Sequence, residues 1–131
     1  FHSVETALRS ALTAGRVIRG LDTAKQVLAA EERGLRLAEE KSVARRGARV
    51  SRLLLIADDG SDGFYRQVEN LLKRHGPRIL AIRLDVDAAQ FGEALFGSEN
   101  QTRLVMISHK EAVAAVLLGL DEATEGGKPR P

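Results

Sequence analysis

Residues 53–57, with the sequence LLLIA, form an uninterrupted apolar run of strand length, and Asp58, Asp59 and Gly60 follow it directly. A continuous apolar run that ends in turn residues is typical of a strand buried on both faces. Such a strand needs a layer of helices on each side of its sheet. The run therefore predicts an α/β fold with helices on both faces of a central sheet.

Helix and strand patterns alternate along the rest of the chain. Shorter apolar segments at 16–19, 79–82 and 104–107 predict three further strands. Apolar residues at helical spacing predict five helices, four of them opening near a residue suited to capping a helix: Ser3, Asp22, Asp87 and Ser108. In the remaining helix, which begins near Gly63, we expect the carboxylates of the preceding turn, Asp58 and Asp62, to act as caps. The predicted fold is a three-layer α/β/α sandwich with a four-stranded, mostly parallel or mixed central sheet.

Chain length and composition indicate one domain. The chain has 131 residues, of which 44% are hydrophobic, enough to bury a single core. We expect this domain at 1–122, with a charged helical extension at 33–51 and a flexible polar tail at 123–131. No apolar run approaches the roughly 20 residues that span a bilayer. Cysteine is absent, so no disulfide-linked partner is expected and a reducing compartment fits.

Residues that could support catalysis or bind a metal form no convincing pattern. The three histidines, His2, His75 and His109, lie in separate segments without a second ligand at zinc spacing. At a helix C-terminus, His75 is better explained by the helix dipole. The acidic turn after residue 57 partly mimics a calcium loop, but a strand precedes it where that loop requires a helix. A magnesium site there is the alternative; otherwise we expect no metal, no cofactor and no enzymatic activity.

One glycine stands where a ligand could approach the backbone. Gly20 links the predicted strand 16–19 to the next helix, and Arg16, Arg19 and Lys25 lie close to it in sequence. A glycine permits close approach, and the free amides of a helix start favour an anion such as phosphate. An ordinary tight turn before a capped helix is the alternative interpretation.

Arginine is concentrated in the charged segment 33–51 and just after it. Because the formal net charge of the chain is only +2, the distribution of charge says more than its sum. We predict an accessory basic surface for RNA; the alternative is a set of solvated side chains with no binding role. The arginines proposed for this surface are Arg45, Arg46, Arg49 and Arg52.

Three stretches together resemble a known family. These are residues 14–25 (AGRVIRGLDTAK), 53–59 (LLLIADD) and 90–97 (QFGEALFG). In this order they resemble the kink-turn RNA-binding ribosomal proteins of the L-seven-Ae and L-thirty-e type, including bacterial and organellar members. The likeness covers residues 4–120 except 33–51. It implies an α/β/α sandwich that binds structured RNA, without catalysis, through the start of the second helix and neighbouring loops.

The same resemblance implies specific RNA contacts. The family pattern Gly-x-Asn-Glu-x-x-Lys begins at Gly20, so that Asp22, Thr23 and Gln26 occupy its Asn, Glu and Lys positions. The loop 84–87 would also face RNA. The implied RNA-binding residues are Arg16, Arg19, Gly20, Leu21, Asp22, Thr23, Lys25 and Gln26.

The resemblance also suggests partners and a location. Structured RNA, ribosomal or kink-turn-like, is the expected partner, together with ribosomal or translation proteins and no membrane. The expected location is the cytoplasm in association with ribosomes, with an organellar matrix as the alternative. The alternative function is a protein-binding module of the same fold in a translation-related complex. RNA binding would be sensitive to salt, whereas protein binding would survive nuclease.

Overall fold

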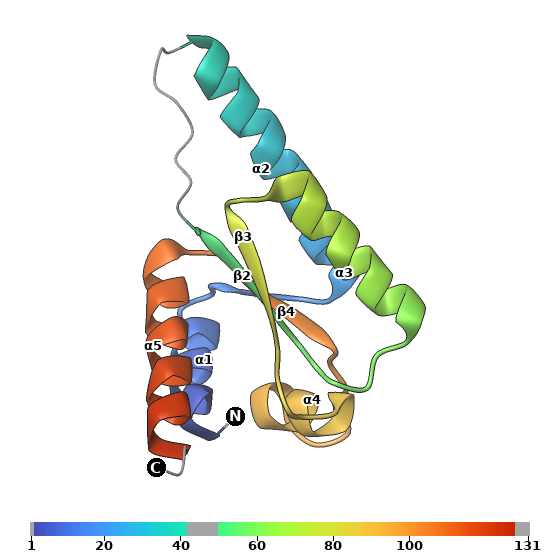
Figure 1. Ribbon diagram of the computed structural model, residues 1–131, viewed down its shortest axis with the longest axis vertical. Coiled ribbons are helices and arrows are strands. Elements are labelled where there is room, and N and C mark those ends of the chain that lie inside the picture. Colours follow the sequence, from blue (N-terminus) through green and yellow to red (C-terminus); the bar gives the residue numbers. More distant parts are fainter. Residues whose placement is uncertain (1, 42–49, 128–131) are drawn as a thin grey trace.

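The computed structural model describes residues 2–41 and 50–127. Its helices and strands alternate in the predicted order (Figure 1). Both the prediction of four strands between five helices and that of a strand at 53–57 are confirmed, the latter with a shift of one residue. The elements are α1 (His2–Thr13), β1 (Val17–Arg19), α2 (Leu21–Lys41), β2 (Arg52–Ile56), α3 (Asp62–His75), β3 (Ile79–Arg83), α4 (Ala88–Phe96), β4 (Leu104–Ile107) and α5 (Lys110–Gly127).

The four strands form one mixed sheet in the order β1-β4-β2-β3. β2 and β3 are parallel, with Leu54 opposite Ala81. β4 lies between β1 and β2 and is antiparallel to both, with Met106 opposite Leu54 and Ile18. Of the two forms predicted for the sheet, the mixed one is correct. Parallel pairing is limited to β2 and β3.

Alternate residues of the central strands build two separate cores, because successive side chains of a strand point to opposite faces. Leu53 and Leu55 face α1, α4 and α5, and they pack with Val105 and Ile107 of β4. The intervening residues, among them Leu54, face α2 and α3 on the other side. This arrangement confirms the three-layer α/β/α sandwich (Figure 1).

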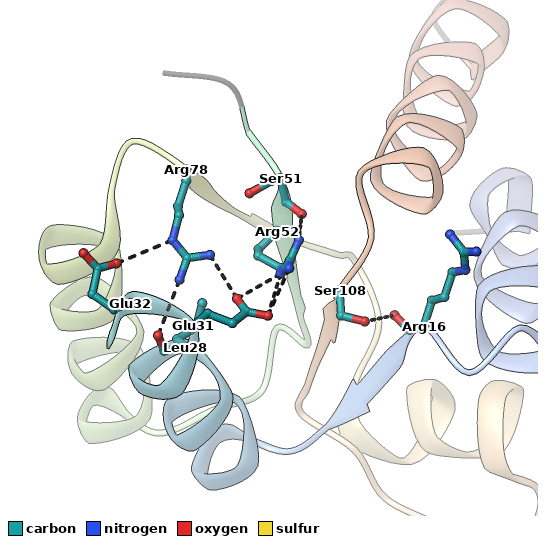
Figure 2. Close-up of polar contacts among 8 residues, drawn as sticks. All are labelled: Arg16, Leu28, Glu31, Glu32, Ser51, Arg52, Arg78 and Ser108. Carbon is teal, nitrogen blue, oxygen red and sulfur yellow. Dashed lines mark hydrogen bonds and ion pairs between the residues drawn. The ribbon is translucent and has the colours of Figure 1, made fainter. Parts of the chain in front are cut away.

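The predicted caps of α2 and α5 are wrong. The carbonyl of Gly20 accepts the first helical hydrogen bond of α2, from the amide of Ala24 at 3.1 Å, so that Asp22 lies inside the first turn. The carbonyl of His109 plays the same part for α5. The hydroxyl of Ser108 instead donates to the carbonyl of Arg16 at 3.1 Å (Figure 2). Ser108, which the sequence analysis predicted to cap α5, thus forms a hydrogen bond to the residue that precedes β1.

The other helix starts differ in how well they match prediction. α3 is capped by Ser61, whose oxygen accepts from the amide of Phe64 at 3.1 Å, and not by Asp58 or Asp62. α4 begins as predicted at Asp87, which forms a reciprocal capping box with Gln90. α1 begins at His2, before the predicted cap at residue 3.

Two predicted segments lie partly in helices. α2 continues to Lys41 and extends past the end of the sheet, so residues 33–41 of the charged extension are helical (Figure 1). Residues 42–49 lie outside the described residues. α5 continues to Gly127, so the predicted tail 123–131 begins inside a helix, and 128–131 also lie outside.

A cluster of charged side chains joins α2 to β2 and β3 (Figure 2). Arg78 is only 4% exposed, and its guanidinium lies 3.0 Å from a Glu31 carboxylate oxygen and 3.6 Å from Glu32. Arg52 donates to both oxygens of Glu31 at 3.0 to 3.1 Å. A buried guanidinium needs such partners because its charge cannot be neutralised by deprotonation. Arg52, predicted as part of the accessory basic surface, is therefore ion-paired within this cluster, with its side chain 21% exposed.

His75 belongs to the same cluster and its protonation should couple to stability. Its imidazole is buried, with Nδ1 3.6 Å from Glu32. Burial lowers the pKa of His75 from 6.5, the carboxylate of Glu32 opposes that shift, and Arg78 adds to it. The imidazole is therefore mainly neutral at pH 7. A favourable interaction of a charged His75 with the helix dipole, which we predicted from sequence, is not what holds it there.

We expect acid to destabilise the protein through His75. Below about pH 6.5 the unfolded chain binds a proton at this position before the folded protein does, so stability falls as pH decreases. Melting temperatures at pH 7 and 5.5 should show a smaller loss in the variant His75→Gln than in the parent. His109→Gln, which removes an imidazole elsewhere, is the control. Equal losses in the parent and His75→Gln would contradict the prediction.

Candidate nucleic-acid interface

One edge of the sheet collects the starts of three helices. Arg19 pairs with Val105, and Ile56 pairs with both Leu104 and Arg83, so the carboxyl ends of β1, β2 and β3 meet the amino end of β4. The helices that follow the first three strands, α2, α3 and α4, all begin there. In open α/β sheets, ligands bind beyond the carboxyl ends of strands. We call this region, with Arg19, Arg83 and Arg103, the arginine edge.

Among the three helix starts at this edge, only that of α2 lacks a side-chain cap. Ser61 caps α3, and Asp87 together with Asp59 accepts the first amides of α4. At α2 the residue in the capping position is Gly20, which has no side chain. No side chain in the described parts of the chain accepts from the amides of residues 21–23. The positive end of α2 thus faces solvent with unpaired donors.

Gly20 is required by the backbone and leaves open space above it. Its φ of +95° lies in the region that only glycine adopts without strain. A Cβ atom built on it would meet nothing within 4 Å, whereas its amide is anchored to the carbonyl of Leu104 at 2.9 Å. A ligand can therefore approach the backbone here closely.

A cleft of about 250 Å³ lies beside this helix start. It is smaller than the roughly 300 to 1,000 Å³ of pockets that enclose small-molecule ligands. Its lining combines two arginines, a half-buried aromatic ring and backbone groups. The lining residues are Arg19, Gly20, Leu21, Phe64, Gln101, Thr102, Arg103 and Leu104. A shallow cleft of this kind suits one phosphate or base of a larger ligand.

Aromatic rings and backbone carbonyls hold two arginines of the edge in position. The guanidinium of Arg19 lies 4.2 Å from the ring centre of Phe96 and donates to the carbonyl of Gln101 at 3.0 Å. Arg83 lies 4.3 Å from the ring centre of Tyr65 and donates to the carbonyl of Asp58 at 3.0 Å. These neutral partners fix each guanidinium without cancelling its charge. The geometry is therefore prepared for an anion.

Arg103, the third arginine of the edge, is only weakly engaged. Its guanidinium lies 3.8 Å from Asp59, and both side chains are close to half exposed. An exposed pair at this distance contributes little. Asp59 is also bound to the amide of Ala88 at 3.0 Å, which places part of its charge at the start of α4. Arg103 thus remains available to a ligand.

A glycine of α4 sets the position of the loop that holds Arg19. A Cβ atom on Gly92 would lie 2.3 Å from the carbonyl oxygen of Asn100 and 2.7 Å from the Cα of Gln101. Only a glycine allows the backbone at 100–101 to pack this closely on α4. Asn100 and Gln101 in turn accept hydrogen bonds from Arg19. Gly92 thereby helps to position Arg19 from behind the candidate interface.

The loop 84–87, which the resemblance places against RNA, is less acidic toward solvent than its sequence suggests. Leu84 and Val86 are buried in the core. The carboxylate of Asp87 accepts a hydrogen bond as the cap of α4. Among these four residues, only Asp85 is exposed with a free carboxylate.

The structure brings together five of the predicted RNA-binding residues and separates the others. Residues 19–23 lie at the arginine edge. Arg16 lies at the opposite end of β1, where its carbonyl bonds to Ser108. Lys25 and Gln26 are further along α2, and Lys25 donates to Gln67 of α3. Arg45, Arg46 and Arg49 lie outside the described residues.

Sequence reasoning missed three residues of this edge: Phe64, Arg83 and Arg103. The signal was present but incomplete. Arg83 directly follows the predicted strand 79–82 and Arg103 directly precedes the strand 104–107. Only the directions in which β3 and β4 pair with β2 reveal that these two ends lie at the same edge.

Other kinds of site find little support in residues 2–41 and 50–127. No three acidic or histidine side chains there are grouped as metal ligands. None of the helices in that part of the chain is both long and apolar enough to span a bilayer.

Comparison with known proteins identifies the fold but no family. The sequence matches no family model and no curated protein. A protein of unknown function from Bacillus halodurans C has a similar structure, with a TM-score of 0.58 over 91% of this chain and 97% of that chain. The two proteins share a fold. At 16% sequence identity, the likeness shows nothing further.

Proposed function

We propose that this chain is a non-catalytic module that binds structured RNA, kink-turn-like or ribosomal, through the start of α2 and the neighbouring loops. The observation that carries the proposal is the uncapped helix start at Gly20, flanked by Arg19 and Arg103. Free amides at the positive end of a helix, with guanidinium groups beside them, form a phosphate-binding arrangement. Association with ribosomes in the cytoplasm belongs to the same proposal and rests on the family resemblance.

Two further features favour RNA over a small anion. The ring of Phe64 is half buried in the wall of the cleft, where an unstacked base could lie against it. The three arginines extend along the sheet edge over four strands and so match a ligand with several phosphates. Gly20 would permit the RNA backbone to reach the amides, and Arg19 would position it.

The salt dependence of binding tests this proposal. Anisotropy titrations of a fluorescent kink-turn RNA at several salt concentrations should show an affinity that decreases steeply with salt. Arg103→Gln should lower the affinity and reduce the salt slope by about 1, because one phosphate contact is lost. Arg16→Gln is a matched control, since Arg16 lies at the far end of β1. Failure of the parent to bind RNA at low salt, or equal effects of the two variants, would argue against the interface.

Binding of another protein is the second candidate function. In its favour, Leu118 on α5 is 62% exposed. Single exposed apolar residues are common on soluble proteins, so this observation is weaker than the arginine edge. A partner retained from cells after nuclease treatment, and lost in Leu118→Gln, would favour protein binding.

A further inference from the structure

α2 and α3 lie side by side and run in the same direction from the arginine edge (Figure 1). Lys25 bonds to Gln67 near the edge, and Glu32 approaches His75 further along. Two adjoining hollows of about 260 and 230 Å³ follow the seam and share Ala29, Arg74 and His75. We call this seam the α2–α3 groove. Its polar lining comprises Lys25, Glu32, Arg33, Arg36, Gln67, Asn70, Arg74 and His75.

The charge of this groove is positive and largely unbalanced. Arg33, Arg36 and Arg74 are exposed, and no carboxylate within residues 4–37 and 50–120 forms an ion pair with them. The one acid in the lining, Glu32, lies 3.6 Å from both His75 and Arg78 and so is committed to the buried cluster. Asp22 lies three residues before Lys25, in the first turn of α2, and lines neither hollow.

We propose that the α2–α3 groove is a second RNA-binding surface, which holds the phosphodiester backbone of the same RNA after it leaves the arginine edge. This inference rests on the proposed RNA-binding function. Lys25 and Arg36 are eleven positions apart on one helix, which is about 16 Å at 1.5 Å per residue. The cations of α2 from Lys25 to Arg36 therefore span enough length to contact several phosphates in succession.

The composition of the groove favours a nucleic acid over an acidic peptide. Peptide recognition depends on apolar anchors that fill pockets. The only apolar residues that line the two hollows are Ala29 and Leu71, and Leu71 is buried. Guanidinium groups with side-chain amides such as Gln67 and Asn70 are instead the groups that bind phosphate and sugar oxygens. Contacts of this type position an RNA without reading its sequence.

A charge-matched pair of double variants tests the groove in the full chain. One removes Arg33 and Arg74 (Arg33→Gln, Arg74→Gln), and the other removes two cations on the helices that cover the opposite face of the sheet (Arg9→Gln, Lys110→Gln). The probe is a kink-turn RNA extended by a helical arm, titrated across a salt series. We expect the groove variant to bind about 10- to 100-fold more weakly at low salt, with a salt slope reduced by about 2. The control variant should retain the parent slope.

The outcomes separate the groove from the function on which it rests. If the parent binds RNA and Arg103→Gln weakens it, but the groove variant keeps the parent slope, the groove inference is overturned and RNA binding stands. If the parent binds no RNA, both proposals are overturned. If polyglutamate displaces the RNA from the parent at equal concentration, and binds the groove variant more weakly, the groove is a site for an acidic protein and the inference is likewise overturned.

Discussion

Replacing Gly20 with leucine should abolish RNA binding, with an affinity at least 100-fold below that of the parent. A leucine side chain would occupy the open space that, under the proposed function, the RNA backbone needs to reach the amides of α2. It would also strain the backbone, because φ at this position is +95°. That strain costs about 1 to 2 kcal/mol, which a domain of ordinary stability survives. Folding should be checked by circular dichroism before anisotropy titration with a kink-turn RNA.

Gly15 provides a matched control for this experiment. It also has a positive φ, +72°, and a Cβ atom there would likewise meet nothing within 4 Å. It lies at the opposite end of β1, away from the arginine edge. Gly15→Leu should therefore destabilise the protein to a similar degree and leave RNA affinity unchanged. Equal RNA binding by the two leucine variants would exclude the start of α2 as the contact.

Removing the carboxylate of Glu31 should destabilise the fold by about 3 kcal/mol, the largest stability effect that we expect of a single substitution outside the hydrophobic core. In Glu31→Ala, Arg52 loses its acidic partner, and Arg78, which is 4% exposed, keeps only Glu32 at 3.6 Å and the carbonyl of Leu28. A buried guanidinium without close compensation is costly. Thermal unfolding should show a decrease on the order of 10 °C in the melting temperature.

An exposed ion pair in the same protein serves as the control. Glu5 and Arg9 lie one turn apart on α1 with 2.8 Å between their charged atoms, and the side chain of Arg9 is 59% exposed. Surface pairs of this kind contribute about 0.5 kcal/mol or less. Glu5→Ala should thus change the melting temperature by only about 1 to 2 °C. A similar decrease in melting temperature in Glu31→Ala and Glu5→Ala would contradict the prediction, because it would show that the ion pairs of Glu31 stabilise the protein no more than an exposed pair.

The sequence predicted the order of elements well because that order depends on local patterns. The apolar run 53–57 and the helical spacing of apolar residues around it are properties of neighbouring positions. Within residues 2–41 and 50–127 the structure has the nine elements that were predicted. The role of Gly20 at the start of α2 also followed from its neighbours. Five residues of the candidate site, those at 19–23, could be predicted from the sequence for this reason.

The remainder of the site depends on contacts between distant segments. Arg52 was assigned to a basic surface because it stands near other arginines, but its partner, Glu31, lies 21 positions earlier on another helix. Ser108 was assigned to a cap, although its hydroxyl bonds to a carbonyl 92 positions away. Arg83 and Arg103 lie at one edge because β3 is parallel to β2 whereas β4 is antiparallel to it. Hydrophobic periodicity does not encode strand direction.

Gly92 limits how this surface can be re-engineered. Any L residue there would place a Cβ atom 2.3 Å from the Asn100 carbonyl oxygen and would push away the loop that orients Arg19. A mutant library aimed at altered RNA specificity can therefore randomise the exposed positions of the arginine edge, but it must hold this helix position fixed. If this position were also randomised, variants with favourable residues at the arginine edge would be lost because a substitution at Gly92 disrupts the packing of α4 on the backbone at 100–101.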